Sequence, residues 1–169
     1  MKSDFHTFRG YQLLIQQQQA LTPSMEDYLE MIYRNCIKEG HVRMNQLADQ
    51  LNVRSSSVTK IVQKLAELDF LIYRPYGIIQ LTEKGTVMGK FLLQRHNMLK
   101  DFLEKLGLTG TLLQDTEMLE HHVSLELLKT IGIFLLFLES QPAFLQAFTE
   151  FRQTLPKTTP VIDLTPTTT

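Results

Sequence analysis

The sequence predicts a mainly α-helical protein with one short β-hairpin, and three features of the chain support this fold class. Apolar side chains recur every three or four residues through several long segments after residue 22, which is the spacing of amphipathic helices. Strand-like segments flank a Pro-Tyr-Gly turn at residues 75 to 77. Hydrophobic residues make up 43% of the 169 residues, enough for a compact core in one domain or two small ones.

Bulk composition excludes several classes of protein. A formal net charge of −1 excludes a protein that is basic throughout, so any nucleic-acid surface has to be a local patch. The single cysteine, Cys36, excludes an intramolecular disulfide and a cysteine-based zinc site. The longest apolar run, residues 131 to 138, is far shorter than the ~20 residues of a membrane span, and residues 1 to 20 lack the apolar core of a signal peptide. We therefore expect a cytoplasmic protein.

The first predicted amphipathic helix follows an N-terminal segment that contains a glutamine run. It begins after a candidate N-cap at Thr22 or Ser24 and ends at Gly40. Its apolar stripe leaves Asp27 and Glu30, three residues apart, as neighbours on the opposite face. Taken alone, such a pair most often belongs to a solvated surface.

Two helices joined by a tight turn are predicted next. The first runs from Met44 to Leu51, and the second runs from a serine cap at about Ser55 to Asp69. The apolar side of the second helix leaves hydroxyl, amide and cationic side chains on its outer face. Such side chains can bond base edges and phosphates, so this face suits the major groove of DNA.

A β-hairpin around the Pro-Tyr-Gly turn completes a winged helix-turn-helix. Residues 70 to 74 and 78 to 82 form its two strands, and a helical hairpin without a wing would more often be purely structural. We expect DNA contacts from the outer helix face and the wing. The candidates are Arg54, Ser55, Ser56, Ser57, Thr59, Lys60, Gln63, Lys64, Arg74 and Tyr76.

The remainder of the chain is predicted to be helical. A long helix covers Glu83 to Leu106, with His96 at the edge of its apolar stripe, and another helix begins at about Leu112. Residues 124 to 140 are apolar on nearly every side, which in a small protein favours burial against a second subunit. A last amphipathic stretch, Ala143 to Leu155, carries three phenylalanines that we expect to pack on the same core.

The segment TEMLEHHVS, residues 116 to 124, concentrates metal-ligating side chains. On an ideal helix Glu117, Glu120 and His121 fall at about 0°, 300° and 40°, on one face, while His122 points elsewhere. The other candidate donors are Asp27, Glu30 and His96. If the six converge, their four carboxylates repel one another unless two divalent cations neutralise them. Oxygen and imidazole donors without sulfur favour hard ions such as Mn²⁺.

Five segments, in this order and spacing, resemble the manganese-sensing branch of the diphtheria toxin repressor family of metal-dependent transcriptional repressors. They are TPSMEDYLEMIY, SSSVTKIVQKL, LTEKG, RHNMLKDFL and EMLEHHVS, and the resemblance spans about residues 22 to 140. It implies a homodimer on double-stranded operator DNA, with an N-terminal winged helix-turn-helix followed by an all-helical metal-binding and dimerisation domain. The family's binuclear manganese ligands correspond to Asp27, Glu30, His96, Glu117, Glu120 and His121. This chain has Ser55 where that branch usually has a proline early in the recognition helix, which leaves the operator sequence open.

The resemblance implies a domain plan and a function. Residues 22 to 83 correspond to the DNA-binding domain and 84 to 155 to the metal-binding and dimerisation domain. The N-terminal extension, 1 to 21, and the tail, 156 to 169, have no counterpart in that branch, and the Pro and Thr content of the tail predicts disorder. We expect a repressor with two Mn²⁺ per subunit as co-repressor, with Fe²⁺, Co²⁺, Zn²⁺ or Cd²⁺ as possible substitutes, and with manganese-uptake genes as targets.

Two other functions are compatible with parts of this pattern, and the sequence offers no candidate catalytic residue. One is a dinuclear carboxylate oxidase in a helical bundle, although such enzymes show Glu-x-x-His on each of two helices and no such pair exists here. The other is a metal-independent DNA-binding protein whose donor residues are vestigial.

Overall fold

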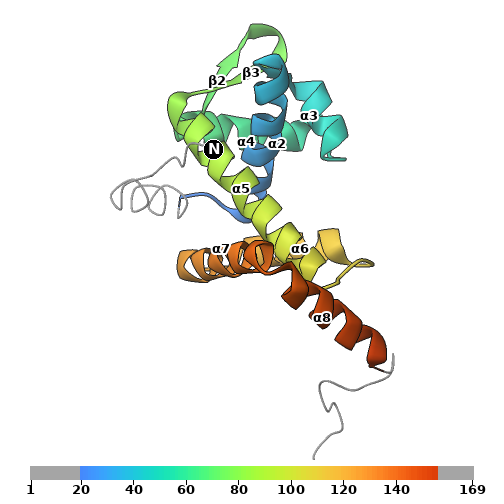
Figure 1. Ribbon diagram of the computed structural model, residues 1–169. Helices are drawn as coiled ribbons and strands as arrows, with labels where there is room; N and C mark the ends of the chain where they lie inside the picture. The colour runs from blue at the N-terminus through green and yellow to red at the C-terminus, as the bar shows by residue number, and fades with distance from the viewer. Residues whose placement is uncertain (1–19, 156–169) are drawn as a thin grey trace, which may run out of the picture. The chain divides into compact units, whose positions relative to one another are not determined.

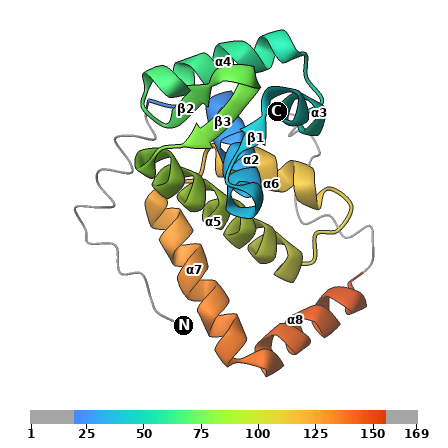
Figure 2. The ribbon, with the colours of Figure 1, turned by 90° about the horizontal axis from the view of Figure 1, so that it is seen from above.

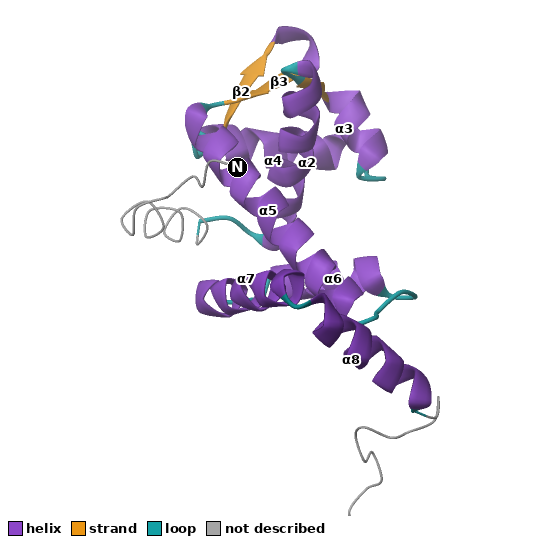
Figure 3. Cartoon of the chain, viewed as in Figure 1, coloured by secondary structure: helices purple, strands orange, loops and turns teal. Residues whose placement is uncertain are grey.

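The computed structural model describes residues 20 to 155, which divide between two compact units. The first unit ends at Asn97 and the second begins at Met98, so the division falls inside one helix. The predicted disordered tail, residues 156 to 169, lies outside the described residues, as does all but the end of the predicted N-terminal extension. The described chain is mainly helical with one small sheet, which confirms the predicted fold class (Figures 1 and 3).

The elements of the first unit form a winged helix-turn-helix. They are α2 (Pro23–Glu39), β1 (Val42–Arg43), α3 (Met44–Gln50), α4 (Ser55–Glu67), β2 (Leu71–Arg74), a 3-10 turn η1 (Pro75–Gly77), β3 (Ile78–Leu81) and the first part of α5 (Glu83–Lys105). The second unit contains the end of α5, then α6 (Leu112–Glu120), α7 (Leu125–Ser140) and α8 (Pro142–Thr154).

Helix α2 begins and ends where its capping signals predict. The Thr22 hydroxyl accepts a hydrogen bond from the Met25 amide, and Pro23 occupies the first helical position, where no amide donor is needed. At the other end Gly40 adopts a left-handed conformation with φ 74°, which glycine tolerates at little cost. The helix buries Leu29 and Ile32 completely, so this face is anchored in the core of the first unit.

The turn between α3 and α4 confirms the helix-turn-helix, but two details of the prediction are wrong. Ser55 is the first residue of α4 rather than its cap; Arg54 occupies the N-cap position and makes no side-chain capping bond. Helix α4 also ends at Glu67, before the predicted end at Asp69, because Asp69 adopts φ 62° and leaves the helical conformation. Its apolar face, formed by Val58, Val62 and Leu65, is fully buried.

The wing is the predicted hairpin, with a third strand that the prediction missed. The sheet has the order β1-β3-β2 and is antiparallel throughout, with Ile79 of β3 opposite Val42 on one side and Tyr73 on the other (Figure 2). Strand β1 is two residues long, too short for side-chain alternation to reveal it. Ile79 and Val42 are fully buried, so one face of the sheet closes the core of the unit.

Helix α5 confirms the predicted long helix and packs closely against the hairpin. Its backbone comes so near the residue before β2 that a Cβ on Gly85 would lie 1.9 Å from the carbonyl oxygen of Phe70, so this position requires glycine. Met88 and Leu92 are fully buried in the first unit, whose apolar core includes Phe70.

Helix α7 of the second unit is anchored on one side and apolar on the other. It buries Leu128, Ile131, Leu135 and Leu138. Leu127, Ile133, Leu136 and Phe137 are exposed in the single chain. This two-sided apolar character is what the sequence predicted for residues 124 to 140.

Helix α8 does not pack on the core as predicted. It has no buried residue, and Phe144 and Phe151 are 50% and 60% exposed. The reason is a 98° bend between α7 and α8, which Figure 2 shows clearly. Phe144 contacts Phe137 edge to face at a centroid distance of 5.4 Å, and Arg152 donates a hydrogen bond to the Gly107 carbonyl. Within the described range no helix by itself is long and apolar enough to cross a membrane. Helices α7 and α8 together have sufficient length and apolar content, but the bend separates them.

Candidate metal centre and DNA-binding face

The first unit brings together one group of candidate metal ligands from α2 and α5. Glu30 and His96 are both buried, at 8% exposure, and the Glu30 Oε1 atom lies 4.0 Å from the His96 Nδ1 atom. Divalent cations lie about 2.0–2.6 Å from each ligand atom, so two ligands of one ion lie about 3–5 Å apart. The two side chains therefore have a separation compatible with a shared cation.

Asp27 lies at an exposed position of α2, one turn before Glu30. Its effect is visible on the adjacent phenol: burial raises the pKa of Tyr28, and the negative charge of Asp27 raises it further. A carboxylate that is already accessible to solvent needs little desolvation to bind a hydrated cation. Asp27 thus differs from Glu30, whose side chain is largely shielded from water.

The second unit holds the other group of candidates at the end of α6. Glu120 is the last residue of this helix and is buried, and its Oε1 atom lies 4.0 Å from the Nε2 atom of His121. His121 keeps nearly helical torsions, φ −81° and ψ −12°, so the ideal-helix argument applies to it. Glu117 is exposed, and His122 is exposed in the following turn. Each unit therefore offers two carboxylates and one imidazole.

Two arginines form ion pairs beside these candidates, and the sequence analysis did not predict either pair. The Arg34 Nη2 atom donates to Glu30 Oε1 at 2.5 Å, and the Arg95 Nη2 atom donates to Glu26 Oε2 at 2.8 Å. The first pair has the i, i+4 spacing of a helical ion pair, a local signal that could have revealed it. The second pair joins residues 69 positions apart, and nothing local predicts it.

A cluster of three side-chain amides, centred on the buried Asn35, connects α2 to the helix-turn-helix. The Asn35 side chain donates to the Gln50 Oε1 atom at 2.7 Å and accepts hydrogen bonds from Gln46 and Gln50 at 3.1 Å. It also donates to the Met31 carbonyl, so the hydrogen-bonding capacity of the buried amide is used. The bonds hold α3 against the helix that carries Asp27 and Glu30.

The predicted DNA-binding residues lie on the surface of the first unit. Arg54, Ser55, Ser56, Ser57, Lys60, Gln63, Lys64, Arg74 and Tyr76 are exposed. Thr59 is half-buried, and its hydroxyl donates to the Ser55 carbonyl, so it is engaged within α4. Tyr76 is 96% exposed at the tip of the wing, and the Arg74 side chain is held by the Gln80 amide at 2.7 Å.

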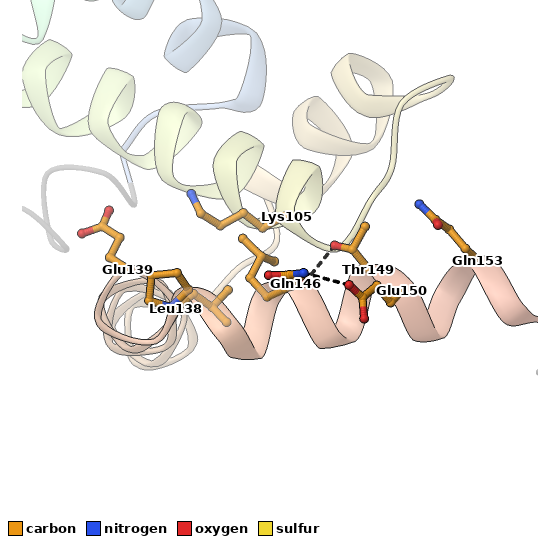
Figure 4. A pocket seen from close by; sticks show the side chains of 9 residues that line it. Lys105, Leu138, Glu139, Gln146, Thr149, Glu150 and Gln153 are labelled. Carbon is orange, nitrogen blue, oxygen red and sulfur yellow. Dashed lines mark hydrogen bonds between the residues drawn. The ribbon is translucent and has the colours of Figure 1, made fainter.

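A hollow of about 690 Å³ in the second unit is not the metal centre. Figure 4 shows Lys105, Gln146 and Glu150 among the residues that line it, and the Gln146 amide donates to Glu150 at 2.8 Å. Its lining contains two glutamates but neither histidine nor cysteine, and a lysine lies beside them. This composition lacks the mixed carboxylate and imidazole donors found on α2, α5 and α6.

Comparisons with known proteins agree with the two-part organisation. Residues 20–79 match the family model for the iron dependent repressor N-terminal DNA binding domain, and residues 82–149 match the model for the iron dependent repressor metal binding and dimerisation domain. The chain is 44% identical over 138 residues to the HTH-type transcriptional regulator MntR of Listeria welshimeri, covering 81% of this chain and 97% of that protein.

Two solved structures share the fold. The manganese regulator SloR aligns with 29% identity and a TM-score of 0.60 over 68% of this chain. The metal-dependent transcriptional regulator MtsR aligns with 26% identity and a TM-score of 0.63 over 69% of this chain. The alignments cover 54% and 55% of those two chains, so this chain corresponds to little more than half of each.

Proposed function

Since the chain belongs to the iron-dependent repressor family of metal-dependent, DNA-binding transcriptional regulators, we propose that it is a manganese-responsive repressor whose co-repressor is Mn²⁺. Family membership makes it a transcriptional regulator rather than an enzyme, which removes the oxidase alternative. The proposed targets are genes for manganese uptake.

The types of donor atom in the proposed ligand set are the main support for Mn²⁺ as the metal. The proposed ligands of two Mn²⁺ ions per subunit are Asp27, Glu30, His96, Glu117, Glu120 and His121. Four carboxylates balance the charge of two divalent cations, and two imidazoles complete a set without sulfur, which suits Mn²⁺ better than softer ions. The carboxylates of Glu30 and Glu120 are buried, so little water screens their attraction for a divalent cation, which supports a binding role.

The proposed mechanism couples metal binding to DNA binding. Ligands come from both units, so bound metal would restrict how the winged helix-turn-helix is presented and favour the arrangement that fits operator half-sites. In the proposed complex, different residues of the DNA-binding unit contact phosphates and bases. Lys60 and Lys64 meet phosphates, Gln63 reads base edges, and Tyr76 and Arg74 on the wing contact the neighbouring backbone.

The proposal includes a homodimer that uses α7. Its exposed apolar residues, Leu127, Ile133, Leu136 and Phe137, form a face that another copy of the chain would shield from water. The metal binding and dimerisation domain that matches residues 82–149 supports this arrangement.

The test combines DNA binding with metal titration. Purified protein is titrated onto a promoter fragment of a manganese-transporter gene and onto an unrelated duplex, with Mn²⁺, Fe²⁺, Zn²⁺ or chelator present. We expect Mn²⁺ to strengthen operator binding at least tenfold over chelator, with little change on the unrelated duplex. Operator binding that is equally tight in chelator would instead support vestigial donors, and calorimetric titration with Mn²⁺ would show this directly.

A further inference from the structure

Arg34 contacts the same carboxylate oxygen that faces His96. The Glu30 Oε1 atom accepts the 2.5 Å hydrogen bond from Arg34 Nη2 and lies 4.0 Å from His96 Nδ1. Arg34 lies one helical turn beyond Glu30 on α2, and all three side chains belong to the first unit. A permanent positive charge therefore contacts the carboxylate oxygen that lies nearest to the imidazole of His96.

We propose that Arg34 is an internal counter-ion that competes with Mn²⁺ for Glu30 and thereby raises the metal concentration at which the regulator responds. This inference rests on the proposed function and concerns the regulation of the same site. Arg34 lies outside the proposed ligand set, because a guanidinium has no acceptor atom with which to bind a cation.

Burial explains why Glu30 needs a counter-ion when no metal is bound. Its side chain is 10% exposed, and an ionised carboxylate in such a position is strongly destabilising unless a positive charge compensates it. Arg34 supplies that charge from the same helix. It therefore stabilises the metal-free protein, and Mn²⁺ has to displace it or share the oxygen with it.

Exposure explains why Arg34 can be displaced. Its side chain is 36% exposed, so the guanidinium can move into water while the aliphatic part stays on α2. Its Nε atom is buried without a hydrogen-bond partner, so release would let this group regain hydration. Arg95 is the contrasting case, since it is 2% exposed and pairs with Glu26, which is outside the proposed ligand set.

The opposite effect is conceivable, because partners that hydrogen-bond to ligands often orient them. Loss of such a partner typically weakens metal binding about 10- to 100-fold. Arginine differs from a neutral orienting group because it stays protonated in proteins and repels a divalent cation at close range. Because Glu30 and His96 are buried, water screens this repulsion only weakly, so it outweighs the gain from orientation and removal of Arg34 should strengthen metal binding.

The experiment measures Mn²⁺ affinity of the full-length protein by calorimetry without DNA, for the parent, Arg34→Gln and Arg34→Lys. We expect Arg34→Gln to bind Mn²⁺ about tenfold more tightly or better, and to lose thermal stability in chelator because Glu30 lacks its counter-ion. Arg34→Lys keeps the charge with a mobile ammonium and should fall between the parent and Arg34→Gln. Lys38→Gln removes one exposed positive charge one turn further along α2 and should match the parent.

The possible outcomes separate this inference from the proposed function. Equal or weaker Mn²⁺ binding by Arg34→Gln overturns the competition and leaves the manganese response standing. If Arg34→Gln does not fold, an Arg34→Lys variant no tighter than the parent overturns it equally. A parent that binds no Mn²⁺ overturns the proposed function and this inference together.

Discussion

The guanidinium of Arg95 and the carboxylate of Glu26 form a buried ion pair, with a distance of 2.8 Å between Nη2 and Oε2 and side-chain exposures of 2% and 7%. The pair joins α5 to α2 immediately next to two proposed ligands, because Glu26 precedes Asp27 and Arg95 precedes His96. It therefore fixes the alignment of the two helices that sets the distance between Glu30 and His96.

Removal of one partner of this pair should destabilise the protein strongly. Arg95→Met removes the buried positive charge that pairs with Glu26, for which we expect a loss of about 3–5 kcal/mol in the free energy of unfolding. The double variant Glu26→Met with Arg95→Met should lose much less, because the Nε and Nη1 atoms of Arg95 are already buried without partners. Urea denaturation in chelator measures both. Equal losses in the single and double variants would show that the ion pair is not what matters here.

The α7 face offers a test of the proposed dimer with an internal control. Leu136 is exposed in the single chain, whereas its neighbour Leu135 is buried. Leu136→Asp should therefore give a folded monomer, because the buried charge is costly only in the dimer, while Leu135→Asp should unfold the second unit. Sedimentation and circular dichroism distinguish the two results. A Leu136→Asp protein that remains dimeric at micromolar concentration would place the interface elsewhere.

The exposed face of α4 predicts two kinds of DNA-binding defect. Lys60→Ala or Lys64→Ala should weaken binding to all duplexes about equally and lower the salt slope by ~1 for each lost phosphate contact. Gln63→Ala should instead reduce the preference for the operator over unrelated DNA, because an amide that bonds a base edge carries sequence information. Fluorescence anisotropy at several salt concentrations measures both effects. Parent-like behaviour of all three variants would exclude α4 as the recognition helix.

Local signals in the sequence predicted most of this fold, because they act within a few residues. Thr22, Pro23 and Gly40 define the ends of α2, and an apolar stripe defines α5. The features that the sequence did not predict depend on contacts between distant residues or on elements too short to show a pattern. Two-residue strand β1 is held by pairing with β3, and the bend before α8 changes what its phenylalanines can reach.

The candidate site divides in the same way. Residue type and helical spacing gave the six candidate ligands and the family resemblance proposed them as a set, whereas the Arg95–Glu26 pair depends on tertiary contact across 69 positions. Arg34 lies between these cases, because its i+4 spacing from Glu30 is visible in the sequence but the burial that makes the pair significant is not. That the six residues, three from each unit, bind the same metal ions remains a prediction from donor chemistry.

Cys36 should react slowly with alkylating reagents in the folded protein. Burial raises the pKa of its thiol, and a backbone hydrogen bond at Leu81 offsets this in part, so less of the reactive thiolate is present at neutral pH. Because the folded state holds this proton more tightly, the contribution to stability falls as pH rises above the ordinary thiol pKa. Iodoacetamide labelling followed by mass spectrometry should be much faster in urea than in buffer at pH 7.5. Equal rates would mean that the thiol is not protected.

The two exposed carboxylates offer the sharpest test of metal choice. Asp27 and Glu117 are both exposed, so substitutions there should leave the apolar core intact. Asp27→Met combined with Glu117→Cys exchanges two negative oxygen donors for a neutral thioether and a thiolate, which shifts preference away from Mn²⁺ towards softer ions. We therefore expect a weaker response to Mn²⁺ and a stronger relative response to Fe²⁺ or Co²⁺.

The experiment measures operator binding anaerobically against metal concentration, with circular dichroism as the folding control. Glu117→Gln is the matched variant, because it removes a charge without adding sulfur. That variant should lose Mn²⁺ response without gaining Co²⁺ preference, and a folded double variant with the parent's Mn²⁺ curve would remove Asp27 and Glu117 from the ligand set.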